Sequence, residues 1–355
     1  MKKIIALTIL AGVLLLSLAQ AQIPNGYYDP AKNLTGTPLR LALHGIIDNH
    51  TSITYNSIPT YFKTTDSKSN GKVWDIYSDV PNGTLPYEYS YTSADQCGNY
   101  SKEGDCFNRE HSWPQSWFNS ASPMVSDLFH IYPTDGYVNG KRANFPYGEV
   151  AAASYTSQNG GKLGPCSFTG YGGTVFEPID EYKGDLARSY FYMCTRYYTE
   201  DASWIATPMT NKAELEPWAV NLLLKWHHQD TVSAKEIDRN NAIYLIQDNR
   251  NPYIDHPEYA DSIWIATPSS VNELEKVNLE IALLPNPANN TVTLLLSNST
   301  VKLTGLYLYD CVGRIVTLNV QAFNELNVQE LPSGFYFLKA EFVEGEVMKK
   351  LVVEH

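Results

Sequence analysis

The chain has 355 residues, of which 43% are hydrophobic and 18% are charged, and its formal net charge is −12. This length exceeds the roughly 100 to 200 residues of a typical domain, so we expect two globular units. The acidic balance excludes a surface that attracts nucleic acid over its whole area, and any attraction for phosphate must therefore be local.

The start of the chain is typical of a secretory signal peptide. Lys2 and Lys3 precede an apolar run, Ile4–Leu18, and Ala19–Ala21 form an A-x-A cleavage site. The apolar run is too short to span a membrane comfortably, which disfavours a transmembrane anchor, and no later stretch reaches about 18 apolar residues. We expect cleavage before Gln22 and export to the medium or the cell surface, without a stable membrane span.

Five cysteines bear on the fold of an exported chain: Cys97, Cys106, Cys166, Cys194 and Cys311. The first two bracket a short polar loop, and disulfides persist in oxidising compartments, so we expect a disulfide between Cys97 and Cys106. A zinc site is the alternative, but the absence of any C-x-x-C pair disfavours it. The pairing of Cys166 with Cys194 stays open.

Apolar periodicity predicts three long helices and one strand in the first part of the chain. The helices are expected at Leu39–Ile47, where Thr37 is a candidate N-cap, at Asp185–Tyr198 and at Glu214–His228. Val73–Tyr77 alternates between apolar and polar residues, which predicts a strand.

The residues that carry chemistry lie in one short span. Glu110 offers a carboxylate and Asn139 an amide oxygen, and both are ligands that suit Mg²⁺ or Ca²⁺. His111, next to Glu110, suits proton transfer. Hydrolysis of a phosphodiester requires a cation that stabilises developing charge and a base that deprotonates water, so these three residues predict a one-metal nuclease site.

Geometry leaves this interpretation open. Adjacent residues on a regular strand point to opposite faces, so Glu110 and His111 can serve one site only if the strand ends or bends there. Pro114 is consistent with such a change in direction. On spacing alone, a surface charge cluster at Arg109–His111 and a tight turn at Asn139–Gly140 explain the residues equally well.

A family resemblance favours the nuclease interpretation. Several stretches, in the same order, resemble the bacterial endonuclease I family of ββα-metal (His-Me finger) nucleases, and the resemblance covers most of residues 25–265. The matching stretches are Asn108–Pro114, Asp127–Leu128, Pro133–Phe145, Lys183–Met193 and Gln247–Pro257.

The resemblance implies an α+β fold with a ββα-metal core surrounded by helices. It also implies that His111 is the general base and that Glu110 and Asn139 bind a catalytic Mg²⁺ completed by water, with Mn²⁺ or Ca²⁺ as alternatives. The family cuts DNA, and often RNA, with little sequence preference and leaves 5′-phosphate ends. Such indifference fits contacts to phosphates rather than to base edges. We expect a monomer.

This chain departs from the family pattern at one supporting residue. Where the family has Asp-Leu-His, this chain has Asp127, Leu128 and Phe129, and His130 follows. The histidine that supports the family's site is therefore either lost or replaced by its neighbour in the sequence.

The second departure concerns the cationic side chain that stabilises the transition state. The stretch between His111 and Asp127 is short and contains no arginine. Arg109, Arg142 and Arg239 are candidates for this role, and we assign it to Arg142, with structural ion pairs as the alternative interpretation.

Substrate contacts are expected from a local basic patch, because the metal and a few cations can attract phosphate in an acidic protein. The candidate substrate-binding residues are Arg109, Lys141, Arg188 and Arg239.

The composition changes after Pro268. Short strands of alternating apolar and polar residues predict a small all-β sandwich at the C-terminus. Four stretches resemble the C-terminal sorting domain of type IX secretion cargo, which implies the type IX secretion machinery as a partner. A carbohydrate-binding or adhesion sandwich is the alternative, which the lack of an exposed aromatic cluster disfavours. The stretches are Pro285–Ala288, Tyr309–Arg314, Leu331–Tyr336 and Lys349–Val353.

We thus expect a signal peptide (1–21), a nuclease domain (22–268), a linker (269–278) and a sorting domain (279–355). The leading hypothesis is a secreted, Mg²⁺-dependent, sequence-nonspecific endonuclease acting on DNA, with RNA as a further substrate. The alternatives are a noncatalytic nucleic-acid-binding or surface protein on a decayed nuclease fold, suggested by Phe129 and the acidic charge, and a phosphodiesterase of small molecules.

Overall fold

The computed structural model divides into two compact units between Thr267 and Pro268. The predicted signal peptide and linker, residues 1–21 and 269–278, lie outside the described residues and stay predictions. The residues that the structure describes are 23–265, 281–296, 303–310, 314–316, 319–322, 325–342 and 345–355.

A strand pair and the helix that follows it form the ββα core of the first unit. β1 (Phe107–His111) pairs antiparallel with β2 (Ile131–Asp135), so that the first residue of β1 lies opposite the last residue of β2. α3 (Gly136–Arg142) follows β2 without a loop. The turn is fixed because the carboxylate of Asp135 accepts the backbone N–H of Val138, which satisfies one of the free amides at the start of the helix.

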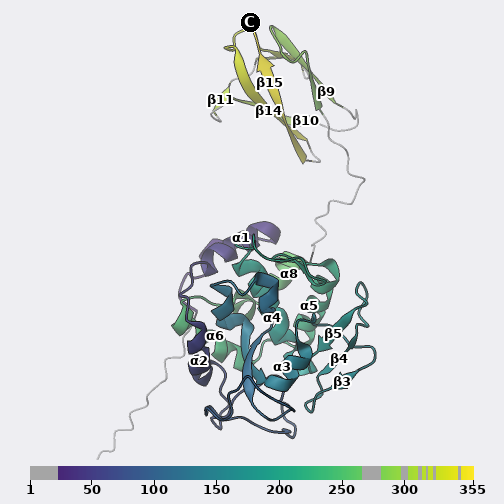
Figure 1. Cartoon of the computed structure of the whole chain (residues 1–355). Coiled ribbons are helices and arrows are strands. Elements are labelled where there is room, and N and C mark those ends of the chain that lie inside the picture. The colour runs from purple at the N-terminus through teal and green to yellow at the C-terminus, as the bar shows by residue number, and fades with distance from the viewer. Residues whose placement is uncertain are drawn as a thin grey trace, which may run out of the picture. The chain divides into compact units, whose positions relative to one another are not determined.

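Helices surround this core, as Figure 1 shows. α4 lies in the middle of the unit, and all 14 of its residues are buried. None of the helices in the described part of the chain is long and apolar enough to cross a membrane. Besides α3, the α-helices of this unit are α1 (Gly36–Ile47), α2 (Ile58–Thr65), α4 (Lys183–Arg196), α5 (Pro217–Gln229), α6 (Ala234–Gln247), α7 (Pro252–Asp255) and α8 (Glu258–Trp264).

Short elements complete the first unit. β3 (Tyr155–Thr156), β4 (Lys162–Pro165) and β5 (Thr174–Glu177) form one antiparallel sheet, and β6 (Thr210–Asn211) pairs with β7 (Glu214–Leu215). The 3-10 helices are η1 (Asp29–Ala31), η2 (Tyr55–Ser57), η3 (Gln115–Phe118), η4 (Met124–Ser126), η5 (Leu128–His130) and η6 (Asp180–Tyr182).

The three predicted helices are confirmed as α1, α4 and α5, with their ends shifted by a few residues. Thr37 is not an N-cap, because α1 begins at Gly36. The predicted strand at Val73–Tyr77 is wrong. Its Asp75 carboxylate accepts the backbone N–H of Tyr77 at 2.8 Å, which closes a turn and takes that amide away from any strand partner.

The second unit is a small β-sandwich, as predicted. Two four-stranded antiparallel sheets, in the orders β11-β10-β14-β15 and β12-β13-β9-β8, bury alternate apolar residues between them. The strands are β8 (Ile281–Leu284), β9 (Thr291–Leu296), β10 (Leu303–Asp310), β11 (Ile315–Val316), β12 (Asn319–Ala322), β13 (Glu325–Asn327), β14 (Gly334–Phe342) and β15 (Gly345–Val353).

The predicted disulfide between Cys97 and Cys106 is present, with Cα atoms 5.7 Å apart. Cys106 directly precedes β1, so the bridge ties the preceding loop to the strand that carries the predicted site. Cys166 and Cys194 are both free thiols, and Cys311 lies outside the described residues.

Removing this bridge should destabilise the first unit. We expect the variant in which both Cys97 and Cys106 are alanine to lose about 2 to 3 kcal/mol of unfolding free energy, because the bridge closes a short loop in the unfolded chain. Urea unfolding followed by tryptophan fluorescence measures this, since all seven tryptophans precede residue 268. Wild-type protein kept reduced is the control. Equal urea midpoints for the oxidised wild type and the variant would contradict the prediction.

Candidate active site

The side chains of β1 alternate between two faces, and this alternation organises the site. Asn108 and Glu110 face α3: the Asn139 amide donates to Asn108 Oδ1 at 2.8 Å, and Arg142 Nη1 donates to Glu110 Oε1 at 2.8 Å. The residues between and after them therefore project to the opposite face.

On that opposite face, Arg109 and His111 both meet the ring of Tyr55, which belongs to η2. The guanidinium carbon of Arg109 lies 4.0 Å from the ring centroid, and the His111 ring is stacked at 6.0 Å. β1 ends at His111. The strand thus ends where it must if Glu110 and His111 are to reach the same site. Adjacent residues can thus serve one cleft, because they stand at the end of the strand.

That cleft has a volume of about 130 Å³ and brings several of the predicted residues together. Its lining residues are Arg109, Glu110, His111, Pro114, Gln115, Asn139, Arg142, Ala143 and Asn144.

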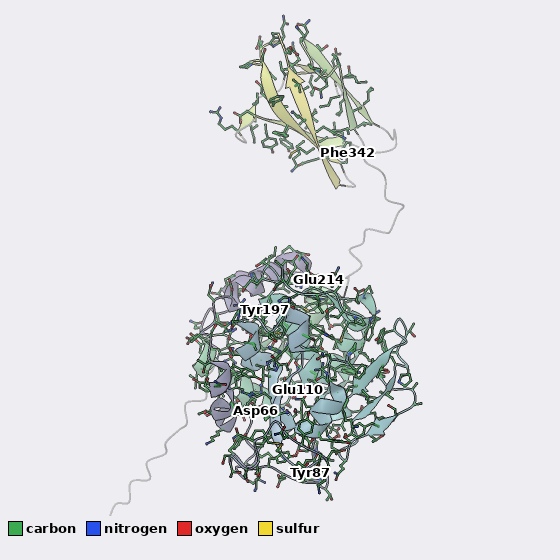
Figure 2. The ribbon with its side chains drawn as sticks, in the orientation of Figure 1. Asp66, Tyr87, Glu110, Tyr197, Glu214 and Phe342 are labelled. Atoms are coloured by element: carbon green, nitrogen blue, oxygen red, sulfur yellow. A yellow bond between two sulfur atoms is a disulfide. The ribbon has the colours of Figure 1, made fainter. Side chains whose placement is uncertain are left out.

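Glu110 lies in the interior of the first unit, where Figure 2 labels it, and is 2% exposed. Its Oε1 accepts from Arg142 and from the hydroxyls of Tyr77 and Tyr147, at 2.8, 2.9 and 3.3 Å. Burial raises the pKa of Glu110, and these three donors oppose that effect by stabilising the carboxylate. Among the described residues nothing donates to Oε2, so one oxygen of this cleft residue is fixed and the other is open.

Asn139 is held in a comparable way. Its Nδ2 donates to Asn108 Oδ1 and, at 3.4 Å, to the backbone carbonyl of Arg109. These bonds fix the amide plane, and no donor in the described part of the chain reaches Oδ1. The cleft therefore contains two hard oxygen atoms with unused lone pairs, one from a carboxylate and one from an amide.

These two oxygens fit a Mg²⁺ ion, which is commonly bound through one or two carboxylates and several waters. The described residues contain no group of three or more histidine, cysteine, aspartate or glutamate side chains that could hold a metal. A cation here would therefore take most of its ligands from water and substrate. Such a site leaves coordination positions open for a phosphate oxygen.

His111 is 5% exposed, and contacts at both of its ring nitrogens orient the imidazole. Nε2 lies 3.1 Å from the backbone carbonyl of Val125. Because a carbonyl only accepts, Nε2 carries the proton and Nδ1 keeps its lone pair, which faces the Gln115 amide at 3.2 Å. Burial lowers the pKa of His111 to about 3, and the imidazole is therefore neutral near pH 7.

The departure from the family pattern at Phe129 does not leave His111 without a histidine neighbour. Phe129 packs against Tyr192, with ring centroids 4.6 Å apart. His130 instead lies beside His111, at 5.4 Å between ring centroids, and its Nε2 is 2.7 Å from the carbonyl of Met124. Burial lowers the pKa of His130 to about 4, so this neighbour is also uncharged near neutral pH.

Arg142 is 1% exposed, and the chain itself occupies its guanidinium. Besides Glu110, its N–H groups reach the backbone carbonyls of His111, Ser112 and Phe145 at 2.9, 2.6 and 3.1 Å. The geometry places Arg142 so that it holds Glu110 and the end of β1. It does not leave the guanidinium free for a phosphate.

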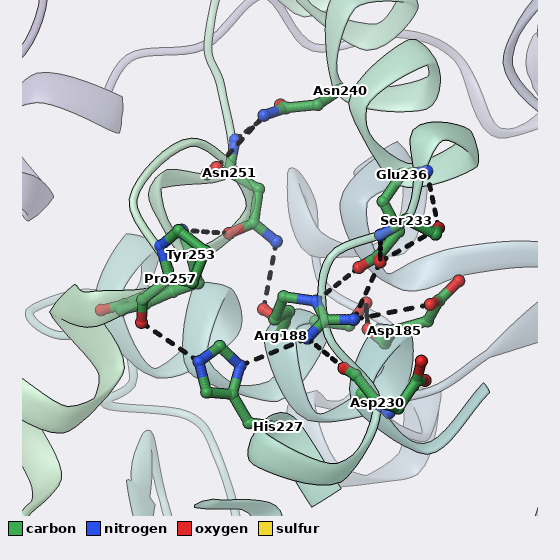
Figure 3. Close-up of polar contacts among 12 residues, drawn as sticks. Asp185, Arg188, His227, Asp230, Ser233, Glu236, Asn240, Asn251, Tyr253 and Pro257 are labelled. Carbon is green, nitrogen blue, oxygen red and sulfur yellow. Dashed lines mark hydrogen bonds and ion pairs between the residues drawn. The ribbon is translucent and has the colours of Figure 1, made fainter. Parts of the chain in front are cut away.

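Two of the predicted substrate contacts lie away from the cleft. Arg188 is fully buried on α4, where it forms a two-pronged ion pair with Glu236 and donates to the carbonyl of Asp230, as Figure 3 shows. Arg239 is 3% exposed and donates to Asp66 and to two backbone carbonyls. The structure therefore does not bring these two arginines to the cleft.

The other two predicted contacts remain accessible. Arg109 is half-buried and lines the cleft. Lys141 is half-buried on α3, where its ammonium lies 5.0 Å from the ring centroid of Tyr137 and 5.5 Å from that of Tyr155.

Sequence reasoning missed three residues that orient the site. Gln115 follows His111 by four residues, so proximity in the sequence could have indicated it. Tyr77 and Tyr147 lie 33 and 37 residues from Glu110, and no local pattern connects a tyrosine to a carboxylate over that separation.

An antiparallel strand pair, a helix, and a carboxylate, imidazole and amide around one cleft define a phosphodiester hydrolase of the ββα class. Residues 35–258 match the model of the Endonuclease I family, and the chain belongs to this family. Residues 282–354 match the secretion system C-terminal sorting domain, which agrees with the predicted type IX sorting domain.

Known relatives agree with this assignment. The chain is 36% identical to the extracellular ribonuclease of Bacillus amyloliquefaciens over 245 residues, which cover 67% of this chain and 78% of the relative. It is 34% identical to the extracellular ribonuclease of Bacillus subtilis (strain 168) over 260 residues, covering 70% and 83%. Endonuclease-1 of Buchnera aphidicola subsp. Baizongia pistaciae (strain Bp) is 31% identical over 132 residues, covering 37% and 46%. The chain is therefore a secreted or cell-surface nuclease.

The Arg188 network predicts a structural effect. Arg188→Ala should lower the unfolding free energy of the first unit by about 3 to 5 kcal/mol, because it leaves Glu236 as a buried charge without its partner. Urea unfolding followed by tryptophan fluorescence measures the loss. Lys141→Ala is the matched control, since among the described residues its ammonium contacts only the rings of Tyr137 and Tyr155, and it should unfold like the wild type. A stable Arg188→Ala protein with weakened substrate binding would instead support the substrate contact predicted from the sequence.

Proposed function

We propose that the chain is a Mg²⁺-dependent, sequence-nonspecific endonuclease that hydrolyses DNA and RNA to 5′-phosphate ends outside the cell. One observation carries this proposal: Glu110 and Asn139 each have one polar atom fixed by hydrogen bonds and one oxygen open, beside a neutral His111. The extracellular ribonucleases among the relatives support RNA as a substrate class.

The open oxygens, Glu110 Oε2 and Asn139 Oδ1, would hold the cation. Mg²⁺ suits two oxygen ligands with several waters, and Mn²⁺ or Ca²⁺ are the alternatives. When bound, the cation supplies positive charge that stabilises the negative charge developing on the phosphate and the leaving oxygen. Arg142 then acts as a positioning residue, because it fixes the Glu110 carboxylate through Oε1.

His111 supplies the base. Its Nδ1 lone pair accepts a proton from water while the Nε2 proton stays bonded to the Val125 carbonyl, which maintains the required tautomer. The resulting hydroxide oxygen bonds to phosphorus, the bond from phosphorus to the 3′ oxygen breaks, and the leaving oxygen takes a proton from water. In this step Gln115 must give up its hydrogen bond to Nδ1, which the attacking water replaces.

Substrate attraction is local in this proposal. Arg109 in the cleft and Lys141 on α3 would contact phosphates, which carry no sequence information. Such contacts explain indifference to sequence, and a net charge of −12 is compatible with them because the cation adds its charge where the phosphate lies.

Metal removal tests the proposal most directly. Purified full-length protein with Mg²⁺ should convert supercoiled plasmid to nicked and linear forms, and EDTA should abolish this. Excess Mg²⁺ added after EDTA should restore cleavage, and ligation of the products without kinase treatment reports 5′-phosphate ends. No cleavage of DNA or RNA with Mg²⁺, Mn²⁺ or Ca²⁺ would favour a noncatalytic protein. Hydrolysis of bis-p-nitrophenyl phosphate with plasmid left intact would indicate a small-molecule phosphodiesterase.

The roles of the two adjacent residues should separate kinetically. His111→Ala should reduce kcat by about 100- to 10,000-fold, because it removes the general base, while the Mg²⁺ dependence of the residual rate stays unchanged. Glu110→Gln is the comparison: it keeps the side-chain size but weakens the cation site, so its half-maximal Mg²⁺ concentration should rise. Wild-type turnover in His111→Ala would remove this residue from the mechanism, and an unchanged Mg²⁺ titration in Glu110→Gln would contradict its role as a ligand.

A further inference from the structure

A second cavity lies next to the catalytic cleft and is not used by the mechanism above. It has a volume of about 400 Å³, which falls within the range of roughly 300 to 1,000 Å³ typical of small-molecule sites. We call it the Tyr55 groove. The residues of its lining on which the argument depends are Tyr55, Phe62, Gln96, Phe107, Asn108 and Arg109.

The Tyr55 groove adjoins the catalytic cleft, because Arg109 lines both cavities. Asn108 lies between the two cavities: the residue lines the groove, and its side chain, which faces α3, accepts the hydrogen bond that orients Asn139. A nucleotide whose phosphate occupies the cleft therefore has the groove as its immediate neighbour. This arrangement favours a part of the substrate as the occupant over an unrelated ligand.

The chemistry of the groove suits a flat, partly polar group. The guanidinium of Arg109 lies against the Tyr55 ring at 4.0 Å, and its Nη1 donates to the Tyr55 carbonyl at 3.1 Å, which fixes the stacked pair. Phe62 and Phe107 are fully buried and give the groove an apolar floor. Aromatic rings and arginine planes are the surfaces on which proteins stack unpaired bases.

Charge and hydrogen-bonding groups agree with this occupant. No carboxylate is among the described residues that line the groove, although the chain as a whole is strongly acidic. Its one charged side chain among the described residues is Arg109, and the amide of Gln96 offers both a donor and an acceptor to the edge of a base.

We propose that the Tyr55 groove binds the nucleobase of a nucleotide adjacent to the scissile phosphate, taken out of its stack. This inference rests on the proposed nuclease function and adds a base-binding subsite to it. Stacking tolerates any base because every base has an aromatic face, so the subsite is compatible with sequence-nonspecific cleavage. A base within a duplex must first be unpaired and unstacked, and single-stranded nucleic acid is therefore the preferred substrate.

The test uses short single-stranded oligonucleotides in which one phosphodiester is cleavable and all other linkages are methylphosphonates. One version carries bases on both sides of the cleavable bond, and two others lack the base on one side or the other. The wild type with Mg²⁺ should cleave one of the two abasic versions with kcat/KM lowered about tenfold or more. The Tyr55→Ala variant should lose a similar factor on the complete oligonucleotide and lose no further activity when that base is removed.

Two further variants define what Tyr55 does. Tyr55→Phe keeps the ring and should recover the discrimination between complete and abasic substrates. Tyr307→Ala, which removes an exposed tyrosine from the second unit, is the matched control and should behave like the wild type. If Tyr55→Ala lowers cleavage of complete and abasic substrates equally, Tyr55 acts through Arg109 on the phosphate and the base subsite is wrong.

The wild type alone keeps the proposal falsifiable if Tyr55→Ala does not fold. Equal cleavage of complete and abasic oligonucleotides by the wild type would overturn the base subsite and leave the nuclease function intact. Failure to cleave any of them, together with intact plasmid and RNA, would overturn the nuclease function as well.

Discussion

The buried ion pair between Glu110 and Arg142 is the interaction on which both the fold and the site depend. Arg142 ends α3, and its guanidinium binds the Glu110 carboxylate and two backbone carbonyls at the end of β1. Removing one partner of such a buried pair typically costs about 3 to 5 kcal/mol. Because this contact uses Oε1, it also determines which carboxylate oxygen remains open. The same contact thus packs α3 on β1 and orients the carboxylate of the candidate ligand.

Some of the arginines of the first unit are buried in ion pairs, and others are accessible to a substrate. Arg188 and Arg239 are buried and paired with acidic side chains, so they add nothing to the field that a polyanion meets at the surface. The cations next to the cleft are few, and Arg109 is the one that lines it without a carboxylate partner among the described residues. An acidic protein can therefore attract phosphate only over a short range, where Arg109 and the proposed cation would act together.

Much of the site follows from local sequence. Glu110, His111 and the cysteine before β1 lie in one short stretch, and the alternating strands of the second unit have period two, so both are visible without the structure. Contacts between distant segments are not. The hydroxyls on Glu110 come from Tyr77 and Tyr147, and the first of these sits in a segment that alternates like a strand but is closed into a turn by Asp75. Likewise, the sequence shows that a residue is basic but not that it is buried.

The alternation along β1 explains how a five-residue strand can support two tasks. Asn108 and Glu110 project toward α3, where the proposed oxygen ligands lie, whereas Arg109 and His111 project toward Tyr55, where proton transfer and base stacking would take place. A shift of one residue in the pairing with β2 would exchange these faces and destroy both tasks together. The Cys97–Cys106 bridge immediately before the strand and the bonds from Arg142 to the carbonyls of His111 and Ser112 at its end both help to fix this register.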